Sequence, residues 1–211
     1  SSASFSPYSV SAGIRPDVAV LACSGWMDGA GYANGAISRF LTLRDNPVHL
    51  LLGPWDHGAR CNVSPWRARV EPEFALLGEL LRFFDHYLMR RATGLEAEAR
   101  IHYFSLHGEE WRDAAAWPPV EAVRRLHLAA DAALADAPPR EAGTDTAQAD
   151  FSLGSGNGTR IERIAGINST TYHADWAERA APLACWTSAP LDAGMELTGH
   201  GIADLWIASS E

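Results

Sequence analysis

Two short segments of this chain contain residues whose types and order suit acid–base chemistry. Asp28 lies in the segment CSGWMDG, and His57 lies in GPWDHG further along the chain. A carboxylate can accept a hydrogen bond from a histidine Nδ1–H, which orients the ring and leaves the other ring nitrogen to accept a proton. Each segment follows an apolar run typical of a strand. We therefore expect the two side chains to meet at one edge of a sheet.

Each residue also has a purely structural interpretation. Asp28 can be the N-cap of a helix, a role that aspartate fills well, and His57 can be a loop histidine with a local structural bond. The order aspartate, then histidine is that of a Ser-Asp-His triad whose serine comes earlier in the chain. No serine elbow of the form GxSxG occurs in these 211 residues. The sequence thus predicts two members of a triad, with the nucleophile upstream.

Two tryptophans and one further set of polar residues lie close to this predicted site. Trp26 and Trp55 either line an acyl pocket or pack at a domain interface. A metal site would use Asp56, His57 and Cys61, but no HxH or HExxH pattern supports one. We expect no metal and no cofactor.

The composition excludes several classes of protein. The chain has 26 acidic and 17 basic residues, all of the latter arginine, and a net charge of −9. No basic cluster stands out, so we expect no nucleic acid as a partner. No apolar run approaches the ~18 residues of a membrane span, and we do not expect the N-terminal segment to be a signal peptide. We expect no membrane partner, and a cytoplasmic location is favoured over secretion.

The expected elements form two parts. In residues 1–96, strands at Asp17–Cys23 and Pro47–Leu52 flank a helix at Gly31–Arg44, which makes a parallel βαβ unit. A long helix from Pro72 to Arg91 has so wide an apolar face that we expect it to lie flat against a sheet. Together they predict an α/β domain.

Residues 97–211 have the pattern of a β module, because short strands follow one another without helices. The chain ends inside a strand-like run, so we expect this second domain to be truncated. The fold class is thus α/β followed by all-β. The expected strands are Arg100–Leu106, Arg124–Ala129, Leu183–Leu191 and Met195–Ala208, and Ala135–Thr170 is expected to be an irregular connection.

The motifs GWMDG, GPWDHG and RFFDHYL resemble those of the cocaine-esterase/X-Pro dipeptidyl-peptidase (CocE/NonD) family of serine hydrolases. The resemblance implies that Asp28 and His57 complete the catalytic triad. It implies that Arg82–Leu88 belongs to the last helix of an α/β-hydrolase domain. It also implies that Glu109–Pro119 and Trp186–Gly201 belong to a C-terminal jelly-roll β-sandwich. Family members have a GxSYxG elbow, an oxyanion-hole tyrosine and a helical cap, and we expect these upstream of this chain.

The resemblance implies hydrolysis of ester or amide bonds, including acyl and X-Pro dipeptidyl bonds. The partner would be a small-molecule ester, an amide or a short peptide, and this chain alone would be inactive. The alternative is a non-catalytic or degenerate relative that acts as a binding module through its β domain. Two further possibilities concern assembly: another chain supplies the serine half, or the chain forms a homo-oligomer.

Overall fold

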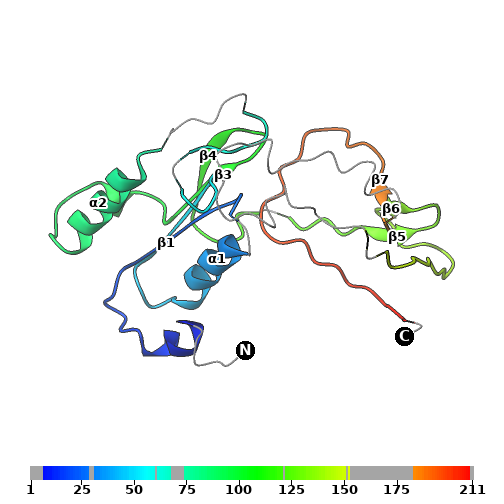
Figure 1. Cartoon of the computed structure of the whole chain (residues 1–211), viewed down its shortest axis with the longest axis horizontal. Coiled ribbons are helices and arrows are strands. Elements are labelled where there is room, and N and C mark those ends of the chain that lie inside the picture. Colours follow the sequence, from blue (N-terminus) through cyan, green and yellow to red (C-terminus); the bar gives the residue numbers. More distant parts are fainter. Residues whose placement is uncertain are drawn as a thin grey trace. The chain divides into compact units, whose positions relative to one another are not determined.

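The computed structural model describes residues 7–28, 31–59, 61–67, 74–120, 122–150, 152 and 183–209. Figure 1 shows the helices and strands of the chain. The described residues divide into two units: the second consists of residues 116–143 and 186–209, and the first consists of the others. Each unit is described by itself.

The first unit is built around a four-stranded sheet in the order β1-β2-β3-β4. The strands β1 and β2 are parallel, β2 and β3 are parallel, and β3 and β4 are antiparallel. The helix α1 connects β1 to β2, so the expected βαβ unit is present. The bounds are β1 Val20–Gly25, α1 Tyr32–Thr42, β2 Val48–Gly53, β3 Ile101–Ser105 and β4 Glu110–Ala114, with a 3-10 helix η2 at Pro7–Gly13.

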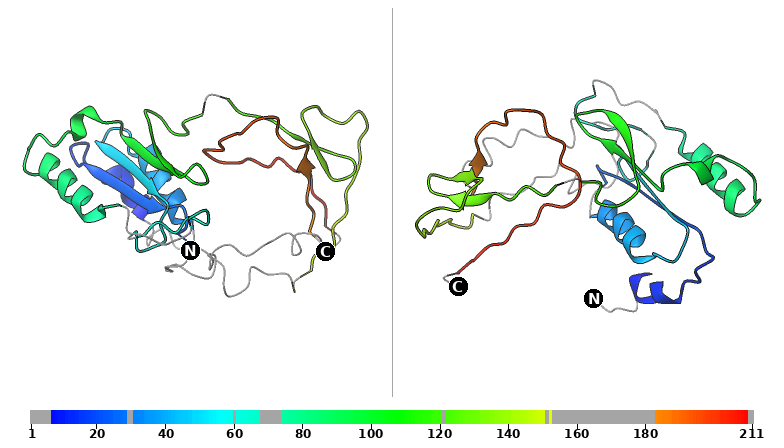
Figure 2. Two further views of the ribbon diagram at one scale, coloured as in Figure 1. Left: turned by 90° about the horizontal axis from the view of Figure 1, so that it is seen from above. Right: turned by 180° about the vertical axis from the view of Figure 1, so that it is seen from behind.

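The strand β2 is the centre of this unit. All six of its residues are buried, which explains why its sequence VHLLLG is an almost continuous apolar run. Figure 2 shows α1 and the second helix α2 (Leu76–Tyr87) on opposite faces of the sheet. The helix α1 buries Ala36 and Ile37 and packs against β1 and β2.

The helix α2 is shorter than the expected Pro72–Arg91, and Pro72 lies outside the described residues. Its apolar face is wide, as expected, but Phe83 is its buried residue. A second apolar stripe is exposed, and it consists of Leu77, Leu81, Phe84 and, just after the helix, Leu88. The described residues therefore cover only part of this apolar face.

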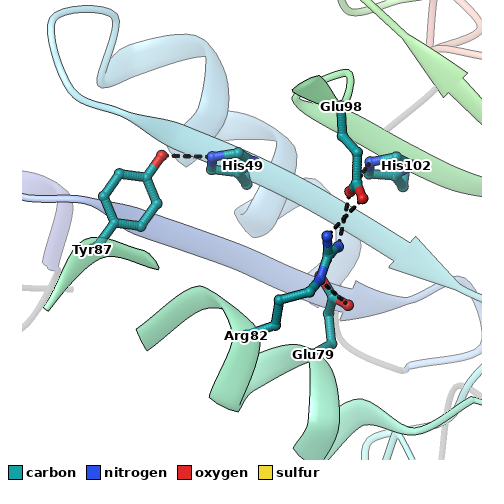
Figure 3. Close-up of polar contacts among 6 residues, drawn as sticks. All are labelled: His49, Glu79, Arg82, Tyr87, Glu98 and His102. Carbon is teal, nitrogen blue, oxygen red and sulfur yellow. Dashed lines mark hydrogen bonds and ion pairs between the residues drawn. The ribbon is translucent and has the colours of Figure 1, made fainter. Parts of the chain in front are cut away.

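Polar contacts attach α2 to the rest of this unit (Figure 3). The Arg82 guanidinium donates hydrogen bonds to Glu79 in the same helix and to Glu98 in the segment before β3, each at 2.6 Å. On β2, the Nε2 atom of His49 lies 2.7 Å from the hydroxyl of Tyr87. These contacts join one face of α2 to the sheet through hydrogen bonds as well as apolar packing.

A short 3-10 helix η3 (Leu95–Ala97) precedes β3. The domain boundary expected at residues 96 and 97 stays a prediction. The strand β3, which follows it, pairs with β2, and β4 extends the same sheet. Sequence analysis did not predict β4.

The second unit contains a small three-stranded sheet in the order β5-β6-β7. The strands β5 (His127–Ala129) and β6 (Ala133–Ala135) are antiparallel, and β6 pairs in parallel with β7 (Thr187–Ser188). Residues 195–208, expected to form a strand, adopt no regular secondary structure. The jelly-roll sandwich stays a prediction. None of the described helices combines the length and apolar character that a membrane crossing requires.

Candidate active site

The candidate site forms where β1 and β2 end side by side. Beyond the strands, the Trp26 N–H donates to the Gly53 carbonyl at 2.9 Å, and the Met27 N–H donates to the Trp55 carbonyl at 3.0 Å. The two loops therefore continue the hydrogen bonding of the parallel pair. This continuity explains how two segments far apart in the sequence are brought to one place.

Glycine at the end of each strand permits this close approach. A Cβ atom at Gly25 would lie 2.0 Å from the Trp55 carbonyl oxygen, and a Cβ atom at Gly53 would lie 2.3 Å from the Trp55 indole. Real Cβ atoms essentially never approach other atoms so closely. Gly25 in CSGWMDG and Gly53 in GPWDHG are thus required by packing.

The structure brings Asp28 and His57 together. The His57 Nδ1 atom lies 3.2 Å from each carboxylate oxygen of Asp28. The Asp28 side chain is 8% exposed, whereas the His57 side chain is 48% exposed. With Nδ1 protonated, the ring donates to a shielded carboxylate and leaves Nε2 as the proton acceptor. A buried orienting acid with an accessible imidazole is the arrangement that general-base catalysis requires.

The N-cap role considered for Asp28 is taken by another residue. Gly31 occupies the N-cap position of α1 in a left-handed conformation, and it makes no side-chain cap hydrogen bond. The Asp28 backbone N–H donates to the Gly25 carbonyl at 3.1 Å, so the residue closes a tight turn after β1. This turn places Asp28 directly after β1.

Local hydrogen bonds shape the loop that contains His57. The buried Asp56 side chain accepts the Gly58 N–H at 3.0 Å, and its carbonyl accepts the Ala59 N–H at 3.1 Å. Further along, the Val63 N–H donates to the Pro54 carbonyl at 2.8 Å and closes the loop. Asp56 therefore makes local structural contacts within this loop.

Tyr32 is a neighbour of His57 that sequence analysis missed. Its ring centroid lies 5.2 Å from that of the imidazole, and its side chain is partly exposed. As the first residue of α1, it follows Asp28 closely in the sequence. That proximity to the aspartate is the signal that points to it.

The two tryptophans of the motifs have different surroundings. The Trp26 indole N–H donates to the Phe104 carbonyl on β3 at 2.7 Å. Trp55 is 1% exposed, and its ring centroid lies 5.1 Å from that of Phe74 and 5.7 Å from that of Trp111. Trp55 therefore packs in an aromatic cluster. The role of both tryptophans in lining a substrate pocket stays a prediction.

Metal and thiol chemistry find little support among the described residues. No group of three or more His, Cys, Asp and Glu side chains in that part of the chain is placed to hold a metal ion. Cys61 packs against a cluster formed by Met27 and Val63. Burial raises the pKa of the Cys23 thiol to about 11, so it stays protonated and unreactive at neutral pH.

Comparison with known proteins relates the chain to enzymes. No protein-family model matches it. Over 193 residues, 91% of the chain, it is 40% identical to proteins named "Putative serine esterase" from Mycobacterium bovis and Mycobacterium tuberculosis. The chain is related to serine esterases. It spans 31% of the length of these relatives, about a third.

A more distant similarity concerns the cocaine esterase of a Rhodococcus species. That match is 27% identical over 103 residues, and it covers 46% of this chain and 18% of the esterase. These relationships connect the chain to proteins named as serine esterases. The narrower assignment to the cocaine-esterase/X-Pro dipeptidyl-peptidase family stays a prediction, because it rests on this weaker similarity and on the motifs.

Proposed function

We propose that this chain supplies the aspartate and histidine of a Ser-Asp-His triad in an esterase-type serine hydrolase. The observation that carries the proposal is the 3.2 Å approach of the His57 Nδ1 atom to the Asp28 carboxylate at the ends of two parallel strands. The names of the relatives add the reaction class. In this proposal the nucleophilic serine belongs to a part of the protein that precedes Ser1.

The proposed mechanism assigns one task to each residue. The serine oxygen bonds to the acyl carbon of the ester while the His57 Nε2 atom takes the hydroxyl proton. When the tetrahedral intermediate collapses, the same proton passes to the departing alcohol. A water molecule then repeats these steps on the acyl-enzyme, releases the acid and restores the serine. Asp28 stays ionised and stabilises the imidazolium that forms twice in each cycle.

The substrate class that we propose is a small ester. The mycobacterial relatives and the Rhodococcus protein are all named as esterases, whereas hydrolysis of amides or X-Pro peptides is supported by the motif resemblance alone. The same proposal makes residues 1–96 the end of an α/β-hydrolase domain and residues 97–211 part of a jelly-roll sandwich.

Ester turnover by the full-length protein tests this proposal. We expect Asp28→Asn and His57→Ala to lower kcat for a p-nitrophenyl ester by about 10⁴-fold, the scale found for loss of triad members. Asp45→Asn and His200→Ala are matched controls, because both residues are exposed, and each should stay within about twofold of the wild type. Near-normal turnover by either site variant would remove that residue from the mechanism.

A further inference from the structure

Glu109 uses both of its carboxylate oxygens to bind the segment that follows the His57 loop. One oxygen accepts the Ser64 hydroxyl at 2.6 Å, and the other accepts the Arg67 Nε–H at 2.6 Å. The first oxygen also accepts the His107 backbone N–H at 3.2 Å. Hydrogen bonds to an ionised acceptor are stronger than those between neutral groups. Glu109 therefore binds two separate parts of the chain.

These contacts are shielded from water. Ser64 is completely buried, and the Glu109 side chain is 18% exposed. A second contact runs beside them, since the Trp66 and His107 rings stack with centroids 4.9 Å apart. The turn between β3 and β4 is thus fastened to residues 64–67 at two points.

The turn itself has an unusual backbone. His107 and Glu109 both have positive φ values, 68° and 55°, in a region that residues other than glycine rarely adopt. The Glu109 N–H donates to the Ser105 carbonyl at 2.8 Å and closes the turn. Such strain persists where surrounding contacts hold it, and the carboxylate of Glu109 supplies them. The conformation is accordingly held by the same bonds that fix Ser64.

The residue next to Ser64 connects this turn to both candidate catalytic residues. Val63 donates its N–H to the Pro54 carbonyl and closes the loop that carries His57. Its side chain, 0% exposed, packs with Met27, which directly precedes Asp28. A shift of Val63 would therefore move the loop that carries His57. It would also move Met27, the residue that precedes Asp28.

We infer that Glu109 is a positioning residue for the Asp28–His57 pair, acting through Ser64 and Val63. The expected effect on turnover rests on the proposed function. The expected effect on the contact between Asp28 and His57 does not. Because small misplacements of a catalytic group can cost about 10²-fold in rate, the contribution should appear in kcat and not in KM.

Glu109→Ala in the full-length protein is the test, and Glu110→Ala is its matched control. Glu110 is the next residue, also an ion-pair partner, but it binds Arg112 on its own strand. We expect Glu109→Ala to lower kcat for a p-nitrophenyl ester by about 10- to 100-fold, with KM within about twofold. The control should leave both constants within about twofold.

A second readout does not depend on turnover. With ¹⁵N-labelled histidine, NMR measures the exchange of the His57 Nδ1 proton with solvent, which the contact with Asp28 slows. Glu109→Ala should accelerate this exchange at least about tenfold, whereas Glu110→Ala should not. If the wild type turns over no ester but the exchange responds as expected, the proposed function fails and the positioning role stands.

Ser64→Ala provides the same test with a smaller change, and it replaces Glu109→Ala should that variant not fold. Because the two residues act through one contact, their effects should not add in the double variant. Unchanged kcat and unchanged proton exchange in a folded Glu109→Ala or Ser64→Ala variant would overturn the inference and leave Glu109 a role in stability alone.

Discussion

Acid should destabilise this protein through His49, a histidine on β2 that is 8% exposed. Burial lowers the pKa of His49 from 6.5 to about 4, and the nearby charges of Arg100, His102 and His86 act in the same direction, against Glu98. Between these two pH values, His49 is therefore protonated in the unfolded chain and neutral in the folded chain. Stability due to this residue is complete above pH 6.5 and is lost as the pH falls toward 4.

The magnitude follows from the difference between the two pKa values. At 1.36 kcal/mol for each pKa unit, the full effect is about 3 kcal/mol, and about 2 kcal/mol of it should be lost between pH 8 and pH 5. Urea unfolding at a series of pH values, followed by tryptophan fluorescence, measures this loss. A His49→Phe variant keeps an aromatic ring in place and should lose about 2 kcal/mol less over the same interval.

The control for this experiment is His200→Ala, which removes an exposed histidine and should retain the wild-type dependence on pH. The window between pH 6.5 and 5 is the informative one. The pKa of Glu98 is lowered, chiefly by its hydrogen bond from Arg82, so this carboxylate adds its own loss of stability at lower pH. If the free energy of unfolding fell equally for the wild type and His49→Phe between pH 8 and pH 5, the reasoning would be refuted.

Three further changes should alter stability, each measured by urea unfolding at pH 7. Gly53→Ala places a Cβ atom 2.3 Å from the Trp55 indole and should cost about 1–3 kcal/mol. Gly35→Ala, whose Cβ atom meets nothing closer than 3.8 Å, is its control and should stabilise α1 by about 0.5–1 kcal/mol. Trp26→Phe removes the indole donor to the Phe104 carbonyl and should cost about 0.5–1.5 kcal/mol. A Gly53→Ala variant as stable as the wild type would contradict the close packing of the two loops.

Strands and helices with a strong apolar pattern were predictable from the sequence. β1 and β2 lie within three residues of their expected bounds, because strands of a parallel sheet have nearly continuous apolar runs. The strand β4 was not predictable. Its sequence EWRDA has little apolar character and is mostly exposed, so its pairing with β3, and not its own pattern, makes it a strand.

Sequence patterns whose structure depends on a distant partner gave wrong expectations. Residues 195–208 were expected to form a strand, yet they adopt no regular structure. The tendency to form a strand reflects packing against neighbours more than the backbone itself. The exposed stripe of α2 shows the same limit. The width of a helix's apolar face indicates which residues can be buried, but not which of them pack against another part of the chain.

Some residues of the candidate site were predictable from the sequence, and others were not. Asp28 and His57 were found from the sequence because strand ends that follow apolar runs are recognisable, and parallel neighbours meet at one edge. Glu109 was missed, because its link to this site depends on contacts between residues 45 apart in the sequence. No local pattern records such a contact.

Covalent labelling by a fluorophosphonate tests the central claim most directly, since the probe reacts with an activated serine and reports on the base that activates it. In the full-length protein, the proposal predicts that one serine preceding Ser1 is labelled. It also predicts that His57→Ala and Asp28→Asn each slow this labelling by at least about 10²-fold, in line with general-base assistance, while His200→Ala does not. A serine that reacts at the wild-type rate in both site variants would contradict the account.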